Sequence, residues 1–73
     1  MEEIRIGTKV SYRGCFGIDK PVEVTVTRIN RSEYKRDKWG DEVYSVPFSE
    51  REYCTFGLDN GHWCYGEQID KIV

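Results

Sequence analysis

The sequence contains no apolar run that approaches the roughly 20 residues of a membrane-spanning helix. It begins with Met-Glu-Glu-Ile, which has neither the basic start nor the apolar stretch of a signal peptide. The three cysteines, Cys15, Cys54 and Cys64, are odd in number and widely spaced, whereas secreted disulfide frameworks use an even set. We therefore expect a cytoplasmic protein with three free thiols, no disulfide and no membrane contact.

Residues for catalysis and metal binding are also scarce. His62 is the single histidine, and on an extended strand Cys64 would lie about 6.5–7 Å from it, beyond hydrogen-bond reach. Structural zinc uses four ligands, usually with paired C-x₂₋₄-C spacing, and no such pair occurs. No glycine-rich phosphate loop and no catalytic carboxylate pair is visible. The sequence predicts no enzyme, no metal site and no cofactor.

What is present fits one small folded domain over residues 1–73. Charged residues make up 33% and hydrophobic residues 38% of the chain, as in soluble globular domains. A domain of this size buries only about 60% of the surface of its unfolded chain, so its core is thin. The net charge is −2, so no overall charge attracts the chain to nucleic acid or to anionic membranes.

The clearest element is a predicted β-hairpin over Tyr53–Gly66, because Asn60-Gly61 separates two aromatic-rich runs. A type I′ turn with these two central residues would pair Leu58 with Trp63 and Phe56 with Tyr65. Strand periodicity then predicts two faces. The core face would hold Cys54, Phe56, Leu58, Trp63 and Tyr65, and the other face Tyr53, Thr55, Gly57, His62 and Cys64.

Further strands are predicted before and after this hairpin. Val22–Asn30 alternates clearly, and a bend or bulge near Thr27-Arg28 would return Ile29 to the core. No stretch has an amphipathic helix pattern, and Val24, Val26, Phe56 and Leu58 are the expected core. A strand over Glu42–Ser49 would place Tyr44, Val46 and Phe48 on one face, and it should lie at an edge or end at Pro47. The other predicted elements are a strand in Met1–Gly14, a loop over Gly14–Pro21, a 3₁₀ turn over Glu67–Lys71 and a last strand at Ile72-Val73.

These elements indicate an all-β fold, a small barrel of five to six strands with a short 3₁₀ turn near the C-terminus. The pattern resembles the SH3-like barrels, in particular the Tudor-like branch. The resemblance lies in Gly7–Tyr12, Val22–Ile29, Cys54–Gly61 and Glu67–Ile72. The Tudor turn reads Asp-Tyr-Gly-Asn, whereas this turn reads Asp-Asn-Gly-His, and Gly57 replaces the family's strand Phe. The resemblance therefore implies the fold and not the methyl-ligand specificity.

Two groups of residues are candidate binding sites. An aromatic cage could form from Tyr12, Phe16, Trp63 and Tyr65, since aromatic rings attract cations; the alternative is that these rings build the core. The polar segment 28–39 combines basic residues with Tyr34 and Trp39, and its alternative is a solvated loop with no contact role. Trp39 could also fold back over the core. The expected ligand-binding residues are Phe16, Tyr34, Arg36 and Trp39.

The pattern favours a small non-enzymatic binding module that docks a protein or peptide. The small size and the lack of catalytic groups suit an accessory protein, and a phage or mobile element could be its source. The alternative is a single-stranded nucleic-acid-binding protein that uses the basic and aromatic residues of segment 28–39. The acidic net charge disfavours that alternative.

Overall fold

The structure is a computed structural model that describes residues 2–37 and 40–73, with the backbone alone at Phe16. It is mostly β, with one single-turn helix and two 3₁₀ helices. The strands are β1 (Glu3–Arg5), β2 (Lys9–Tyr12), β3 (Val22–Arg31), β4 (Asp41–Val43), β5 (Ser45–Pro47), β6 (Cys54–Leu58), β7 (Trp63–Tyr65) and β8 (Ile69–Ile72). The helical segments are α1 (Gly14–Gly17), η1 (Phe48–Tyr53) and η2 (Gly66–Gln68).

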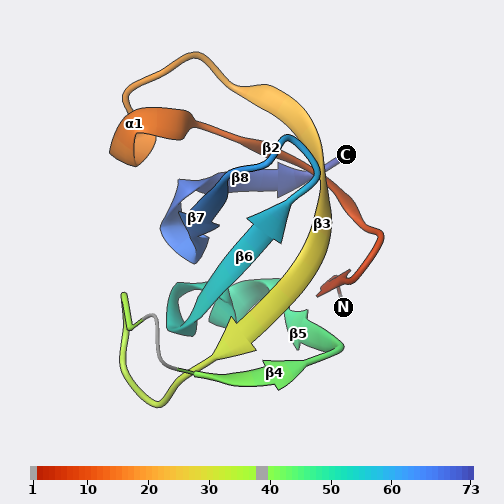
Figure 1. The fold of residues 1–73 in the computed structure, drawn as a ribbon, viewed down its shortest axis with the longest axis vertical. Helices are drawn as coiled ribbons and strands as arrows, with labels where there is room; N and C mark the ends of the chain where they lie inside the picture. The colour runs from red at the N-terminus through yellow and green to blue at the C-terminus, as the bar shows by residue number, and fades with distance from the viewer. Residues whose placement is uncertain (1, 38–39) are drawn as a thin grey trace.

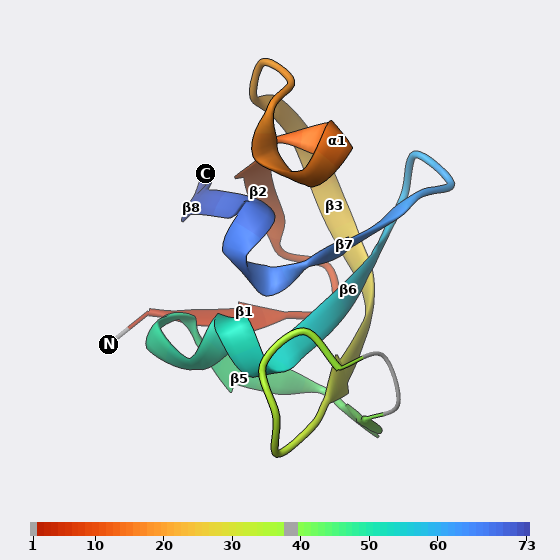
Figure 2. The same cartoon turned by 90° about the vertical axis from the view of Figure 1, so that its left-hand side faces the viewer.

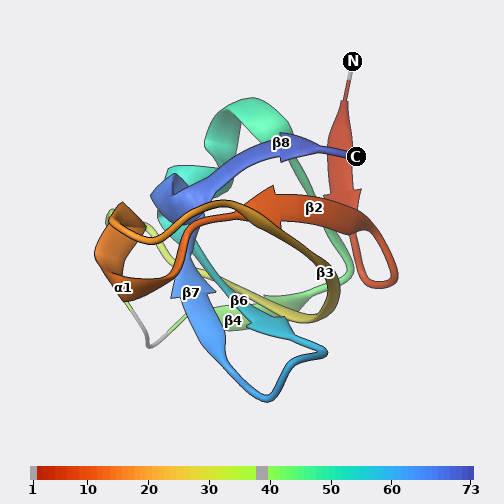
Figure 3. The ribbon, with the colours of Figure 1, turned by 90° about the horizontal axis from the view of Figure 1, so that it is seen from above.

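Six of these strands form one antiparallel sheet, in which β7, β6, β3, β2 and β8 follow one another and β4 also pairs with β3. A second, two-stranded sheet contains β1 and β5. The long strand β3 joins the two halves of the larger sheet. Its first half pairs with β2 and its second half with β4 and β6. Figure 1 shows β3 curving along the height of the molecule, and Figure 3 shows the strands following one another around the core.

The curvature of β3 has the cause that the sequence predicts. The register with β6 shifts between Val26, which faces Leu58, and Arg28, which faces Gly57. A bulge of this kind bends a strand and resets its alternation. Ile29 is consequently buried together with Val24 and Val26, which confirms both the expected bulge and the expected core positions. Arg28 is exposed on the opposite face.

The β6–β7 hairpin turns where expected, but its register differs by one residue. The backbone N–H of Leu58 donates to the carbonyl oxygen of His62, and the N–H of Gly61 donates to Leu58. The loop therefore has three residues and ends at Gly61, where φ is +84°. This is a type I turn with a glycine bulge rather than the predicted type I′ turn.

The shifted register reverses the faces of β7, because a slip of one residue moves every side chain to the other side of a sheet. Phe56 now faces Cys64, which is 1% exposed. The predicted core positions of Trp63 and Tyr65 are wrong, as is the predicted outward position of Cys64. Trp63 is 47% exposed and Tyr65 half-buried.

Two predicted strands are interrupted, which gives eight strands in place of five or six. The first breaks at Gly7, where φ is +96°, into β1 and β2. The strand predicted over Glu42–Ser49 breaks at Tyr44 into β4 and β5, so Tyr44 does not share a face with the buried Val46. Tyr44 is 85% exposed. As expected, the strand ends at Pro47, and η1 follows it.

The remaining core joins both sheets into one hydrophobic cluster. It includes Phe56 and Leu58, as the alternation of β6 predicts. The expected 3₁₀ turn near the C-terminus is present as η2, which lies against η1, but it is shorter than predicted, because residues 69–71 belong to β8. Gly66 makes this close approach possible, since a Cβ there would lie 1.6 Å from the carbonyl oxygen of Arg51. The cluster consists of Ile4, Val10, Tyr12, Val24, Val26, Ile29, Val46, Cys54, Phe56, Leu58, Cys64 and Ile69.

The hairpin register can be tested with paired lysine substitutions. We expect Cys64→Lys to prevent folding, because an unpaired charge in the core costs more than about 4 kcal/mol. Trp63→Lys should lower the free energy of unfolding by about 1 kcal/mol or less, as at partly exposed sites. Urea denaturation followed by circular dichroism measures both. A larger loss of unfolding free energy in Trp63→Lys than in Cys64→Lys would instead indicate the type I′ register.

The cysteines divide by environment: Cys15 is exposed, whereas Cys54 and Cys64 are buried, and all three are free thiols. Desolvation raises the pKa of Cys54 to about 11 and that of Cys64 to about 12. Because the thiolate is the reactive form, we expect Ellman's reagent at pH 8 to titrate one thiol in the folded protein and three in urea. Rapid reaction of two or more thiols in the folded state would contradict this burial.

Candidate functional site

The two aromatic side chains of β7 lie together on the outside of the sheet. The ring centroids of Trp63 and Tyr65 are 5.1 Å apart in an edge-to-face arrangement. The guanidinium of Arg36 lies 5.1 Å from the ring centroid of Tyr65, on the side of the 32–37 loop. This is within the range of a cation–π contact. The structure thus joins Arg36 from one predicted site with Trp63 and Tyr65 from the other.

A small hollow of about 150 Å³ adjoins these rings, and Cys15 and Gln68 complete its lining. Gln68 is nearly buried and holds the segment after β7 in place. Its side-chain oxygen accepts from the N–H of Tyr65, and its amide donates to the carbonyl oxygen of Arg13. We call the five residues Cys15, Arg36, Trp63, Tyr65 and Gln68 the β7 surface.

The β7 surface includes two unusual backbone conformations. Among the described residues, Cys15 (φ 52°) and Arg36 (φ 59°) are the non-glycine residues with positive φ. The left-handed conformation costs an ordinary residue about 1–2 kcal/mol, and such strain concentrates at binding sites and switch regions. One of these conformations lies in α1 and the other in the 32–37 loop, and both segments contribute to the β7 surface.

The basic residues of the 31–37 segment are paired with carboxylates. Arg31 pairs with Glu50, Arg36 with Glu67, and the ammonium of Lys35 lies 2.9 Å from the carboxylate of Glu52. The side-chain hydrogen bond and the charge of the partner raise the pKa of Lys35 and lower that of Glu52. Each exposed pair adds little stability. Together they fix the segment against η1 and η2 and reduce its positive potential.

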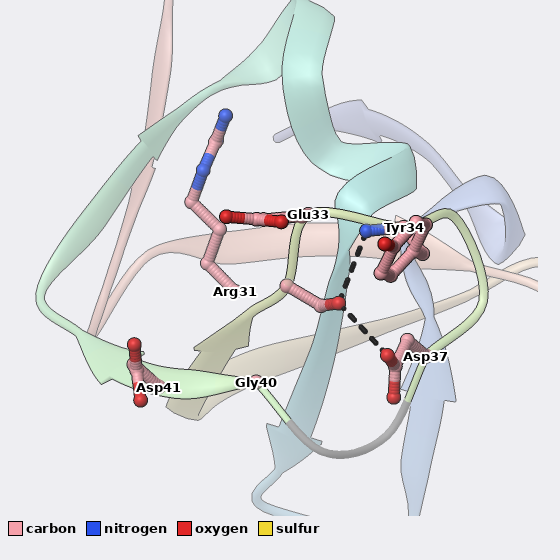
Figure 4. A pocket seen from close by; sticks show the side chains of 7 residues that line it. Arg31, Glu33, Tyr34, Asp37, Gly40 and Asp41 are labelled. Atoms are coloured by element: carbon pink, nitrogen blue, oxygen red, sulfur yellow. Dashed lines mark hydrogen bonds between the residues drawn. The ribbon is translucent and has the colours of Figure 1, made fainter.

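The same segment encloses a polar hollow of about 410 Å³ (Figure 4). The hydroxyl of Ser32 donates to the carboxylate of Asp37 and accepts from the backbone N–H of Tyr34. The figure shows the ring of Tyr34 beside Asp37 and the side chain of Arg31 directed away from them. Tyr34 is 70% exposed and stays a candidate contact residue on this loop.

The other predicted site residues are Tyr12, Phe16 and Trp39. Tyr12 is 6% exposed, and its hydroxyl accepts a hydrogen bond from the side-chain amide of Asn60. For Tyr12 this favours the alternative reading, in which the ring builds the core rather than a cage. The backbone of Phe16 lies in α1, and Trp39 lies outside the described residues.

Sequence reasoning missed the contribution of β3 and β6 to the surface next to Trp63. Arg28, Thr55 and Gly57 line a hollow of about 430 Å³ that Trp63 borders. The alternation along β6 had placed Thr55 and Gly57 on its outer face. Their proximity to Trp63 was not predicted, because the predicted register placed the Trp63 ring in the core, on the opposite face of the sheet.

Two further features concern residues 2–37 and 40–73, the part of the chain that the structure describes. Within these ranges no group of three or more His, Cys, Asp or Glu side chains is arranged to hold a metal ion. Within the same ranges no helix has both the length and the apolar character needed to cross a membrane.

Comparison with known proteins gives this site no precedent. No protein-family model matches the chain, and neither a curated protein nor a solved structure matches it.

Proposed function

We propose that this protein is a non-enzymatic binding module, an SH3-like barrel that docks a protein or peptide on its β7 surface. The architecture is supported by the long bent β3 shared between the halves of the sheet and by the 3₁₀ turn before the last strand. The single observation that carries the function is the outward position of Trp63 and Tyr65, which the hairpin register imposes.

The composition of the β7 surface favours a protein partner. Trp, Tyr and Arg supply most of the binding energy in protein interfaces, and all three types meet here within cation–π and ring-contact distance. A partly exposed Trp beside a hollow gains free energy when a partner covers it. The strand β7 also lies at the end of the strand order, at one edge of the sheet.

The nucleic-acid alternative is opposed by charge. Arg31, Lys35 and Arg36 already have carboxylate partners, and the chain carries a net charge of −2. Binding to a phosphate backbone requires several available cations. We therefore expect fluorescence anisotropy with a labelled dT20 oligonucleotide to detect no saturable binding at 100 mM salt. Saturable binding with a steep salt dependence would favour the alternative.

The docking function predicts separate effects on binding and folding. We expect a random peptide library displayed on phage to yield ligands of the wild-type protein whose affinity falls about tenfold or more in Trp63→Ala, as for a central interface Trp. The melting temperature should change little, because this ring lies outside the core.

Tyr34→Ala is the matched control, since it removes another exposed ring from a neighbouring loop. Retained affinity in Tyr34→Ala and loss in Trp63→Ala support the β7 surface. Loss in Tyr34→Ala alone would instead place the contact on the 31–37 segment.

A further inference from the structure

A channel runs along the outer face of β6, between the side chains of β3 and β7. The residues of β6 on this face are small, namely Thr55 and Gly57, and both are buried between the larger side chains of the neighbouring strands. Thr55 faces Asn30 on one side and Tyr65 on the other. Gly57 faces Arg28 and Trp63 in the same way. Neighbouring strands are about 4.8 Å apart, so the two walls are separated by roughly 9–10 Å at the backbone.

Gly57 keeps the floor of this channel low. A Cβ at this position would lie 3.1 Å from the Cβ of Arg28 and 3.2 Å from the hydroxyl of Thr27. The close approach follows from the bulge in β3, which also directs Arg28 to the outer face. Bulges often reorient a side chain beside a functional site. The resulting hollow of about 430 Å³ has a volume typical of ligand sites.

Arg28 differs from every other arginine of the chain. Four of the six arginines form ion pairs, and Arg51 donates to two backbone carbonyl oxygens. Within the part of the chain that the structure describes, the guanidinium of Arg28 has no hydrogen-bond or ion-pair partner. A guanidinium is a planar fork of donors that matches a carboxylate. The β7 wall of the channel is therefore aromatic, and the β3 wall carries a guanidinium that is available to bind a carboxylate.

We propose that this β6 channel binds an extended peptide segment of a partner protein, with one carboxylate of the segment paired to Arg28. The proposal rests on the docking function above and specifies its ligand. An extended chain has the width of one strand, so it fits between β3 and β7. Its apolar side chains pack on Trp63 and Tyr65, while its carboxylate reaches the guanidinium on the opposite wall.

Glu42 limits the number of acidic groups that the channel accepts. It faces Asn30 from β4 and lines the same hollow as Arg28, and it forms no ion pair with any residue that the structure describes. A second carboxylate on the β4 side would be repelled by Glu42. The same repulsion opposes a polyanionic nucleic acid, so the preferred ligand carries one acidic residue among apolar ones.

A display experiment with charge reversal tests the ligand class. A random peptide library is selected on the wild-type protein, on Arg28→Glu and on Arg5→Glu. Arg5 is the matched control, because it is exposed on β1 and pairs with Glu3, away from the channel. We expect ligands with one Asp or Glu for the wild type and for Arg5→Glu. Arg28→Glu should select Lys or Arg at the corresponding position.

A double-mutant cycle then assigns the contact. Replacing the carboxylate of a selected peptide by its amide should weaken binding to the wild type about tenfold or more, as for a charged hydrogen bond. The same replacement should have no effect on Arg28→Gln, which lacks the charge. Circular dichroism confirms that each variant is folded, and Arg28→Gln replaces Arg28→Glu in the selection if the latter does not fold.

The outcomes distinguish this inference from the docking function. The selected peptides could depend on Trp63 and show no preference for Asp or Glu, or they could keep that preference in Arg28→Glu. Either result overturns the channel proposal and leaves the docking function standing. Selection of no peptide by the folded wild-type protein overturns both. Binding of dT20 in the channel, lost in Arg28→Gln, also overturns the peptide assignment.

Discussion

The three-residue turn at Asp59–Gly61 is the constraint on which the exposed surface depends. Its last residue adopts a left-handed conformation that glycine takes without strain. The turn length fixes the pairing of β7 with β6, and the pairing decides which of two alternating sets of side chains is buried. With Cys64 in the core, both aromatic rings of β7 are placed on the outside. A loop shorter by one residue would bury these rings and remove the β7 surface.

Tertiary hydrogen bonds hold this turn in its observed length. The backbone N–H and the carboxylate of Asp59 bond to the backbone of Thr25 on β3. The side chain of Asn60 accepts from the N–H of His62 and donates to the hydroxyl of Tyr12. These bonds reach β2 and β3, which are distant in sequence. The turn is thus selected by the rest of the sheet as well as by its own residues.

The basic side chains on the two sides of the outer face of β6 differ in whether they form ion pairs. Arg31, Lys35 and Arg36 form ion pairs with carboxylates of η1 and η2, and these pairs hold the loop beside Tyr65 in place. Arg28 is placed differently, because the bulge in β3 directs it away from those carboxylates and toward β6. One guanidinium consequently stays available opposite the aromatic wall. The proposed channel would therefore select its ligand by a single charge and by aromatic contact.

The sequence by itself determined the positions of β3 and β6, the bulge near Thr27, the location of the hairpin and the core residues of both strands. Each follows from local alternation of apolar side chains or from turn chemistry. The break at Tyr44 and the faces of β7 were decided by the tertiary structure. Alternation defines two faces of a strand but does not say which is buried when Cys64 and Trp63 are both apolar. Pairing with distant strands decided that choice, and with it the place of the candidate site.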